Sequence, residues 1–284
     1  MKALLETLRK TLPSLTPKLA QIARVVLDQP NRVATESMRA LAKQSGVTAP
    51  TMIRFARELG FDGYDSFKNV FLASVNEQDF AERANWLRQA SENDGISSII
   101  QNSAEASYRN NRKFYQSLDM TEICQAADLI LNANNVYVVS AGGLHSIASY
   151  LHYVGKMAVP QMRLAGTGGG GLVESLIPLK KDDVVITLAF NPYARYGIEA
   201  TRFALSRGAK LVFFTDSPAA PLASEATILL LQKTDSPQFF PSMVSVMSAV
   251  ETLISVIVAR SGENAVQNIA TYSEIRRKSN FYID

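Results

Sequence analysis

The stretch "LAKQSGVTAPTMIRFARELGF", residues 41–61, predicts two short amphipathic helices joined by a tight turn. Gly46 is placed to end the first helix, and Thr48 is placed to cap the second. Pro50 fits the first turn of the second helix, where its missing N–H is not needed. Two helices joined in this way form a helix-turn-helix motif. Its apolar contacts are expected from Ala40, Leu41, Val47, Met52, Ile53, Phe55, Ala56 and Leu59.

In such motifs the second helix lies in the major groove of DNA, with its first residues at the base edges. Arg54 is suited to guanine, and the methyl groups of Ala49 and Thr51 to thymine. The residues predicted to contact bases are Thr48, Ala49, Pro50, Thr51 and Arg54, and those predicted to contact phosphates are Lys43, Ser45, Arg57 and Lys68. From the residues alone, a helical hairpin that only packs or dimerises stays an alternative.

The charge of the chain is unevenly distributed. Residues 1–77 hold 11 Lys and Arg against 7 Asp and Glu, whereas the remainder holds 18 against 19. The positive excess therefore lies in the first quarter of a chain whose net charge is only +3. This pattern predicts a basic module attached to a near-neutral body.

Composition also predicts the compartment. The chain has 284 residues, 47% of them hydrophobic, which is enough for about two packed domains. A single cysteine, Cys124, favours a reducing environment. The N-terminal residues show no signal peptide, and no run of about 18 apolar residues indicates a membrane span. We therefore expect a cytoplasmic protein without membrane contact.

The pattern of apolar residues changes along the chain. Residues 1–77 have the helical period, and residues 78–108 are predicted to form a linker that becomes helical. After a further helix, four short β-branched or aromatic runs alternate with helical segments. This alternation predicts a parallel sheet covered on both faces. The strand runs are residues 135–143, 182–190, 209–217 and 225–232, the helical segments 120–135, 144–156, 195–208 and 241–262.

Two parts of the sequence resemble one known family. The pattern T-x-x-R-F-A-R-x-L-G-F, residues 51–61, resembles the helix-turn-helix domain of RpiR/MurR transcription regulators. In that family a sugar isomerase (SIS) domain follows, and "GAKLVFFTDSPAAPLASEA", residues 208–226, is similar to the fourth-strand region of SIS domains. The resemblance implies an all-helical DNA-binding domain, residues 1–77, then the linker, and an α/β SIS domain of Rossmann-like type, residues 109–284, which binds an effector and dimerises.

The predicted effector site lies in three loops at the carboxyl ends of strands, residues 140–146, 189–197 and 215–221, because parallel sheets bind ligands at that edge. The resemblance implies a phosphosugar there, usually held by an S-x-S-G-x-T loop. Here Ala189, Asn191, Pro192 and Ala194 stand in place of Ser, Ser, Gly and Thr. The candidate ligand-binding residues are Ser140, Gly142, Gly143, His145, Ser146, Ala189, Asn191, Tyr193, Arg195 and Thr215. Tyr193 and Tyr196 favour a flatter or more apolar effector, or a different set of hydrogen bonds.

Other chemical motifs are weak. The stretch "GTGGGG", residues 166–171, matches G-x-G-x-x-G but does not follow the first strand, so we expect no dinucleotide cofactor. His145 and His152 have no Cys or His-Glu-x-x-His partners, so we expect no metal site. No nucleophile elbow is present, and we assign no catalytic residues.

These patterns lead to one hypothesis and one principal rival. The hypothesis is a DNA-binding transcription regulator, with repression the commoner sign in the family. As a homodimer or tetramer, it would bind an inverted-repeat operator and sense a small metabolite. The rival is a phosphosugar isomerase with an added helical domain, for which Glu251 would be the candidate acid or base.

Overall fold

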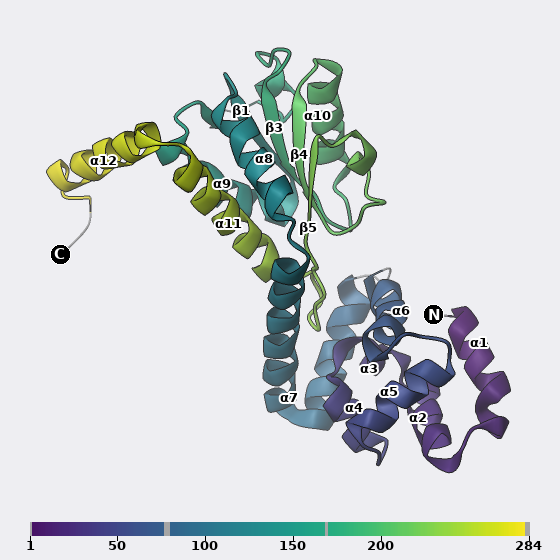
Figure 1. Ribbon diagram of the computed structural model, residues 1–284. Helices are drawn as coiled ribbons and strands as arrows, with labels where there is room; N and C mark the ends of the chain where they lie inside the picture. Colours follow the sequence, from purple (N-terminus) through teal and green to yellow (C-terminus); the bar gives the residue numbers. More distant parts are fainter. Residues whose placement is uncertain (1, 77–79, 168–169, 282–284) are drawn as a thin grey trace. The chain divides into compact units, whose positions relative to one another are not determined.

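The computed structural model describes residues 2–76, 80–167 and 170–281, and it divides into two compact units. The first unit comprises Met1–Arg109 together with Asp235–Ser242. The second comprises Asn110–Thr234 and Met243–Asp284. Figure 1 shows that the first unit is built of helices and that the second contains a sheet.

The first unit is helical, as predicted. Its helices are α1 (Lys2–Thr11), α2 (Pro17–Asp28), α3 (Pro30–Thr35), α4 (Met38–Gln44), α5 (Ala49–Glu58), α6 (Tyr64–Asn76) and the first part of α7 (Phe80–Ser117). The helical pattern of residues 34–46 favours one continuous helix, but the structure divides this stretch between α3 and α4. The chain becomes extended at Ser37, whose side-chain oxygen accepts a hydrogen bond from the Ala40 N–H at 3.1 Å and so starts α4 afresh.

The core of this unit is centred on the ring of Phe67 in α6. The centroid of this ring lies 5.6 Å from that of Phe55, 5.6 Å from that of Phe61 and 5.0 Å from that of Phe71. The Phe55 pair is nearly perpendicular, the edge-to-face arrangement that aromatic rings prefer. Because Phe55 belongs to α5, the cluster fixes which face of α5 is turned inward.

Helix α7 and a short segment complete the first unit. Gly95 has φ +76° within α7 and kinks it, a conformation that glycine adopts without a Cβ penalty. The guanidinium of Arg83 donates to the carbonyl oxygens of Ser236 and Gln238. Asp235–Ser242 is therefore held by the helical unit although it follows the last strand of the sheet.

The second unit contains a five-stranded parallel sheet in the order β2-β1-β3-β4-β5. The strands are β1 (Val136–Ser140), β2 (Met162–Leu164), β3 (Val184–Leu188), β4 (Lys210–Thr215) and β5 (Ile228–Leu231). Four of them occupy the predicted runs. The sequence missed β2, which has only three residues and too short a pattern to detect.

Alternate residues of each strand serve two apolar cores, because successive side chains of a strand point to opposite faces. Val136 and Val138 pack with α8 (Met120–Leu131), α9 (His145–Ala158) and α11 (Val244–Arg260). Tyr137 and Val139 pack with α10 (Arg195–Ser206) on the other face. Helices thus cover both faces, as predicted, and Figure 1 shows α8 and α10 on opposite sides of the strands.

The chain ends in α12 (Glu263–Lys278), a helix that the sequence analysis did not predict. Ala265 is its one buried residue among those described. Over the described residues, no single helix is long and apolar enough to cross a membrane, although α11 and α12 pass that test as a pair bent by 113°.

The position of Phe67 leads to a stability prediction. Replacing Phe67 by Ala should lower the free energy of unfolding by about 3–5 kcal/mol, because it leaves a cavity against several rings. Urea unfolding of both proteins would measure this difference. Tyr108→Ala is the matched control, since Tyr108 is 75% exposed and its loss should change stability by less than about 0.5 kcal/mol. Equal losses for the two variants would contradict the central role of Phe67.

Candidate functional site

The predicted helix-turn-helix is present as α4, a turn and α5. Gly46 has φ +62°, and its N–H donates to the Lys43 carbonyl at 3.1 Å, so it ends α4 as expected. The Val47 N–H donates to the Ala42 carbonyl at 2.9 Å, and the Val47 side chain packs against the core from the turn. These bonds fix the angle at which α5 leaves the turn.

Helix α5 has one buried and one exposed face. Met52, Phe55 and Ala56 are buried, at the spacing that places them on one side of a helix. Of the predicted DNA-contacting residues, Lys43, Thr48, Pro50, Arg54 and Arg57 are exposed, and Ala49 and Thr51 are partly exposed. Ala40, expected among the apolar contacts, is exposed instead.

Thr48 does not act as the predicted cap. It stands at the N-cap position, but its side chain makes no capping hydrogen bond. Its hydroxyl lies 2.9 Å from that of Thr51, one turn into the helix. The first N–H groups of α5 therefore receive no acceptor from the Thr48 side chain, although the Thr51 N–H donates to the Thr48 backbone carbonyl at 2.9 Å.

Two of the predicted phosphate contacts, Ser45 and Lys68, need correction. Ser45 is the C-cap residue of α4 and is only 5% exposed. Lys68 is 4% exposed, and its ammonium donates to the carbonyl oxygen of Glu36. A buried lysine with this partner does not reach a phosphate. The error arose because the burial of Lys68 depends on α3, thirty-two residues earlier in the chain.

Burial also changes the chemistry of Lys68. Removal from water, together with the positive charge of Arg109, lowers the pKa of its ammonium to about 7. Asp235, Asp65 and Glu105 act in the opposite direction but do not restore the usual value. Nearby, burial raises the pKa of the Tyr64 hydroxyl, as do the charges of Glu36 and Asp65.

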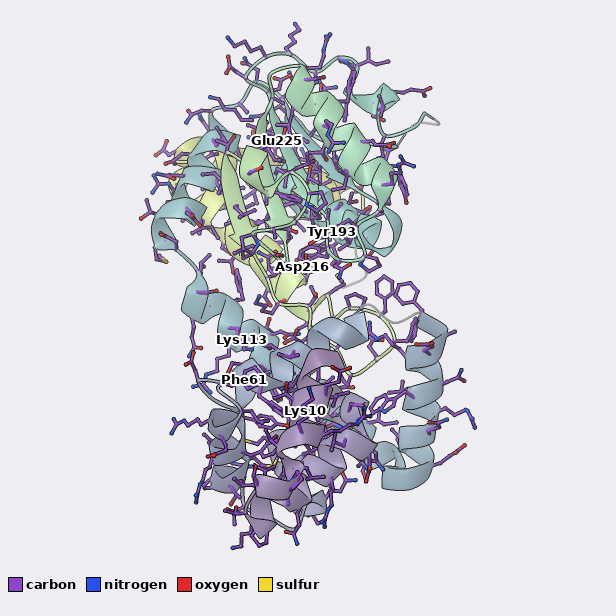
Figure 2. All side chains as sticks on the ribbon, turned by 90° about the vertical axis from the view of Figure 1, so that its right-hand side faces the viewer. Lys10, Phe61, Lys113, Tyr193, Asp216 and Glu225 are labelled. Atoms are coloured by element: carbon purple, nitrogen blue, oxygen red, sulfur yellow. The ribbon has the colours of Figure 1, made fainter. Side chains whose placement is uncertain are left out.

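In the second unit, the three predicted loops converge at the carboxyl edge of the sheet. The Gly142 N–H donates to the Tyr196 hydroxyl at 2.9 Å, which joins the loop after β1 to the start of α10. The Tyr193 hydroxyl donates to Asp216 at 2.7 Å, which joins the loops after β3 and β4. Figure 2 shows Tyr193 and Asp216 next to one another. We refer to loops 140–146, 189–197 and 215–221 as the effector edge.

Tyrosines occupy polar positions at the effector edge. Burial raises the pKa of the Tyr193 hydroxyl, and the hydrogen bond to Asp216 raises it further, so Tyr193 stays a neutral donor. Tyr196 is 55% exposed, and its hydroxyl oxygen already accepts the hydrogen bond from the Gly142 N–H. That amide is a backbone donor of the type that holds phosphate in glycine-rich loops.

The other predicted ligand residues differ in access. Gly142, Gly143, Ser146 and Arg195 are exposed, and Arg195 pairs with Glu199 at 3.0 Å. His145 and Asn191 are partly exposed. Ser140, Ala189 and Thr215 are buried, so a ligand would not meet these side chains without a local rearrangement. The Ser140 hydroxyl is buried without a hydrogen-bond partner in the described part of the chain.

The remaining motifs carry little chemistry. In "GTGGGG", residues 168–169 lie outside the described residues, and the Gly166 N–H donates to the Ser175 hydroxyl at 2.8 Å. Over residues 2–76, 80–167 and 170–281, no group of three or more His, Cys, Asp or Glu is placed to hold a metal ion. Glu251 accepts a hydrogen bond from Tyr150 at 3.2 Å and is exposed on α11.

Comparison with known families matches both units. Residues 2–78 match the helix-turn-helix domain of the rpiR family, and residues 129–256 match the SIS domain. The chain belongs to the RpiR family. The resemblance and the fold predicted from sequence are thus confirmed for this RpiR-family protein.

Several known proteins are similar to this chain along most of its length. An HTH-type transcriptional regulator of Caldanaerobacter subterraneus subsp. tengcongensis is 24% identical over 97% of each chain. The regulator HexR of Pseudomonas aeruginosa is 25% identical over 92% of this chain and 91% of its own. The structure of the Vibrio vulnificus NanR protein complexed with ManNAc-6P has a TM-score of 0.58 at 17% identity, over 97% of this chain and 98% of that one.

Some relatives are longer proteins with a different name. The bifunctional protein glk of Burkholderia pseudomallei is 23% identical over 96% of this chain, but the match covers only 41% of its own length. The RpiR-family protein therefore corresponds to less than half of that relative. What the relative does as a whole does not transfer to this chain.

The burial of Lys68 leads to a pH prediction. The pKa of Lys68 is about 7 in the folded chain and about 10.4 in an unfolded one. Between these values the unfolded chain binds more protons, so the free energy of unfolding should rise with pH, by at most about 1.4 kcal/mol per pH unit. Below pH 7 Lys68 should contribute no slope. Above about pH 10 the raised pKa of Tyr64 should reverse the trend.

Urea unfolding between about pH 7 and pH 10 would measure this slope. Lys68→Met should flatten it, whereas Lys43→Met, a change at an exposed lysine of the same unit, should leave it as in the wild type. If Lys68→Met kept the full slope, Lys68 would not be its source.

Proposed function

We propose that this RpiR-family protein is a DNA-binding transcription regulator in which α5 enters the major groove and the effector edge binds a small metabolite. The observation that carries the proposal is the exposed face of α5. Arg54 and Arg57 project to solvent, opposite the side that Phe55 holds in the core. Arg54 is free of ion pairs within the described residues, so its guanidinium is available to a base.

The proposed regulator acts as a symmetric dimer. Two copies of α5 about 34–36 Å apart would meet successive turns of the major groove on one side of a duplex, which requires an inverted repeat. We propose that the regulator represses transcription when it is bound to its operator. An effector would change occupancy of the operator only if it bound the DNA-competent state and the other state with different affinity.

The rival function, a phosphosugar isomerase, receives less support. The hydroxyls of the family's S-x-S-G-x-T loop are replaced by Ala189, Asn191 and Ala194. Glu251, the candidate acid or base, is exposed and hydrogen-bonded to Tyr150, and no described contact links it to the effector edge. An isomerase assay on the common aldose and ketose phosphates would detect turnover if this assignment were wrong.

The proposed effector differs from an ordinary phosphosugar in the groups that hold it. The NanR protein of Vibrio vulnificus is complexed with ManNAc-6P in its structure, so a sugar phosphate is the reference ligand. In this chain the Tyr196 hydroxyl occupies the Gly142 amide, and Asp216 contributes a negative charge beside Tyr193. Both features disfavour a phosphate and favour a flatter or less charged molecule with hydroxyl donors.

The role of Arg54 can be tested by DNA binding. Arg54→Ala should weaken binding to the operator by about 1–3 kcal/mol and should change binding to random DNA much less, if Arg54 forms a bidentate pair with guanine. Gel shifts with DNA from upstream of the protein's own gene, and with a random duplex, would measure both affinities. Equal losses on the two duplexes would make Arg54 a phosphate contact. Absence of any shift with the wild type would reject the regulator.

The effector can be tested by thermal shift on the full chain. A ligand that binds only the folded protein at about a hundred times its Kd should stabilise it by about 2.7 kcal/mol. ManNAc-6P and other hexose and pentose phosphates should produce little shift in the wild type. Tyr196→Phe should respond more, because removal of the hydroxyl leaves the Gly142 amide without an acceptor. A large and selective shift of the wild type with one sugar phosphate would refute the proposed effector class.

A further inference from the structure

A hollow lies beside α5 that the sequence analysis did not anticipate. It has a volume of about 640 Å³ and is formed where the first turn of α2 packs near the first turns of α5. Its lining residues are Thr16, Pro17, Lys18, Leu19, Pro50, Thr51 and Arg54. Three of these residues were already predicted to contact DNA, whereas the four from residues 16–19 were not.

The charged groups of the hollow are of one sign. Lys18 and Arg54 are both exposed, and no carboxylate belongs to the lining. Neither cation forms an ion pair within residues 2–76, 80–167 and 170–281. By contrast, exposed Arg88 pairs with Glu92, and exposed Arg260 pairs with Asp128. The hollow therefore keeps two cations that an anion can approach without displacing a carboxylate.

Apolar residues also line the hollow. Pro17 and Pro50 are exposed, and Leu19 is buried. The Thr16 hydroxyl makes no capping bond with α2, so it stays available as a donor. A sugar-phosphate strand offers partners for both kinds of residue, because charged phosphates are separated by largely apolar deoxyribose rings.

The position of the hollow selects the occupant. Arg54 belongs both to the exposed face of α5 and to the hollow. When a recognition helix lies in the major groove, neighbouring elements of its domain meet the phosphates that border the groove. A small free anion would use the cations but would leave the apolar surface uncovered.

We propose that this hollow binds one sugar-phosphate strand of duplex DNA, with Lys18 holding a phosphate at the border of the groove that α5 enters. This inference rests on the proposed DNA-binding function and extends it to α2. Lys18 supplies affinity and orientation without base specificity, because phosphates carry no sequence information. It takes the role that the sequence analysis gave to Lys68, which is buried.

The test compares two changes of equal charge on one helix. Lys18→Ala removes the proposed phosphate contact. Arg24→Ala is the matched control, because Arg24 is exposed on the same helix but lies six residues on, about 240° around its axis. Affinities of the full chain for a random duplex, and for the tightest sequence selected in vitro from a random library, are measured from about 50 to 200 mM salt. Lys18→Arg is included to restore the charge.

The expected result is weaker binding of Lys18→Ala to both duplexes, by a similar factor. The slope of log K against log salt should fall by about 0.9, so the affinity lost between about 50 and 200 mM salt should be about 3.5-fold smaller. Arg24→Ala should keep the wild-type slope, and Lys18→Arg should restore it.

Three outcomes would overturn the proposal. Lys18→Ala and Arg24→Ala with the same slope would show only a general effect of net charge. A loss confined to the selected sequence would make Lys18 a base contact. If Lys18→Ala changed neither affinity nor slope while Arg54→Ala weakened binding, the proposed regulator function would be retained and the proposed role of α2 would be rejected. No DNA binding by the wild type would instead reject the proposed function itself.

Discussion

The packing of Phe55 against Phe67 is the contact on which the proposed DNA interface depends. Their ring centroids lie 5.6 Å apart, with the rings nearly perpendicular. A helix has only one orientation about its axis once a large side chain on it is buried. With Phe55 inward, Met52 and Ala56 follow it into the core, and Arg54 and Arg57 are turned to solvent. The chemistry of the exposed face is thus a consequence of the packing on the opposite face.

The same unit separates its cations into two groups by burial. Lys68 is buried, its ammonium donates to the Glu36 carbonyl, and its pKa is lowered. It is part of the packing between α3, α6 and their neighbours. Lys18, Lys43, Arg54 and Arg57 are exposed. A count of basic residues predicts a positive field around the domain, but only the exposed cations can exchange their hydration for phosphate contacts. The positive excess of residues 1–77 therefore overstates the number of charges that face a partner.

At the proposed effector edge, the protein's own side chains satisfy groups that a ligand there would otherwise bind. The Tyr196 hydroxyl accepts from Gly142, and Asp216 accepts from Tyr193. An incoming ligand must replace these bonds or add to them, so its binding is coupled to the position of the loops at residues 140–146, 189–197 and 215–221. Such a coupling is what a sensor needs, because a ligand shifts a conformational equilibrium only through a difference in affinity between two states.

Local sequence patterns were enough to predict the two fold classes, the helix-turn-helix and four of the five strands. These features are local. A helical period of 3.6, a continuous apolar run or a glycine at a turn can each be recognised within about ten neighbouring residues. Local patterns did not determine β2, which is too short for a period, or the break at Ser37. Three features follow from long-range packing alone: Lys68 is buried, Tyr196 bonds Gly142 across 54 residues, and Lys18 lines the same hollow as Arg54. The physical reason is that burial and partnership are set by chain segments distant in sequence, which no local pattern records.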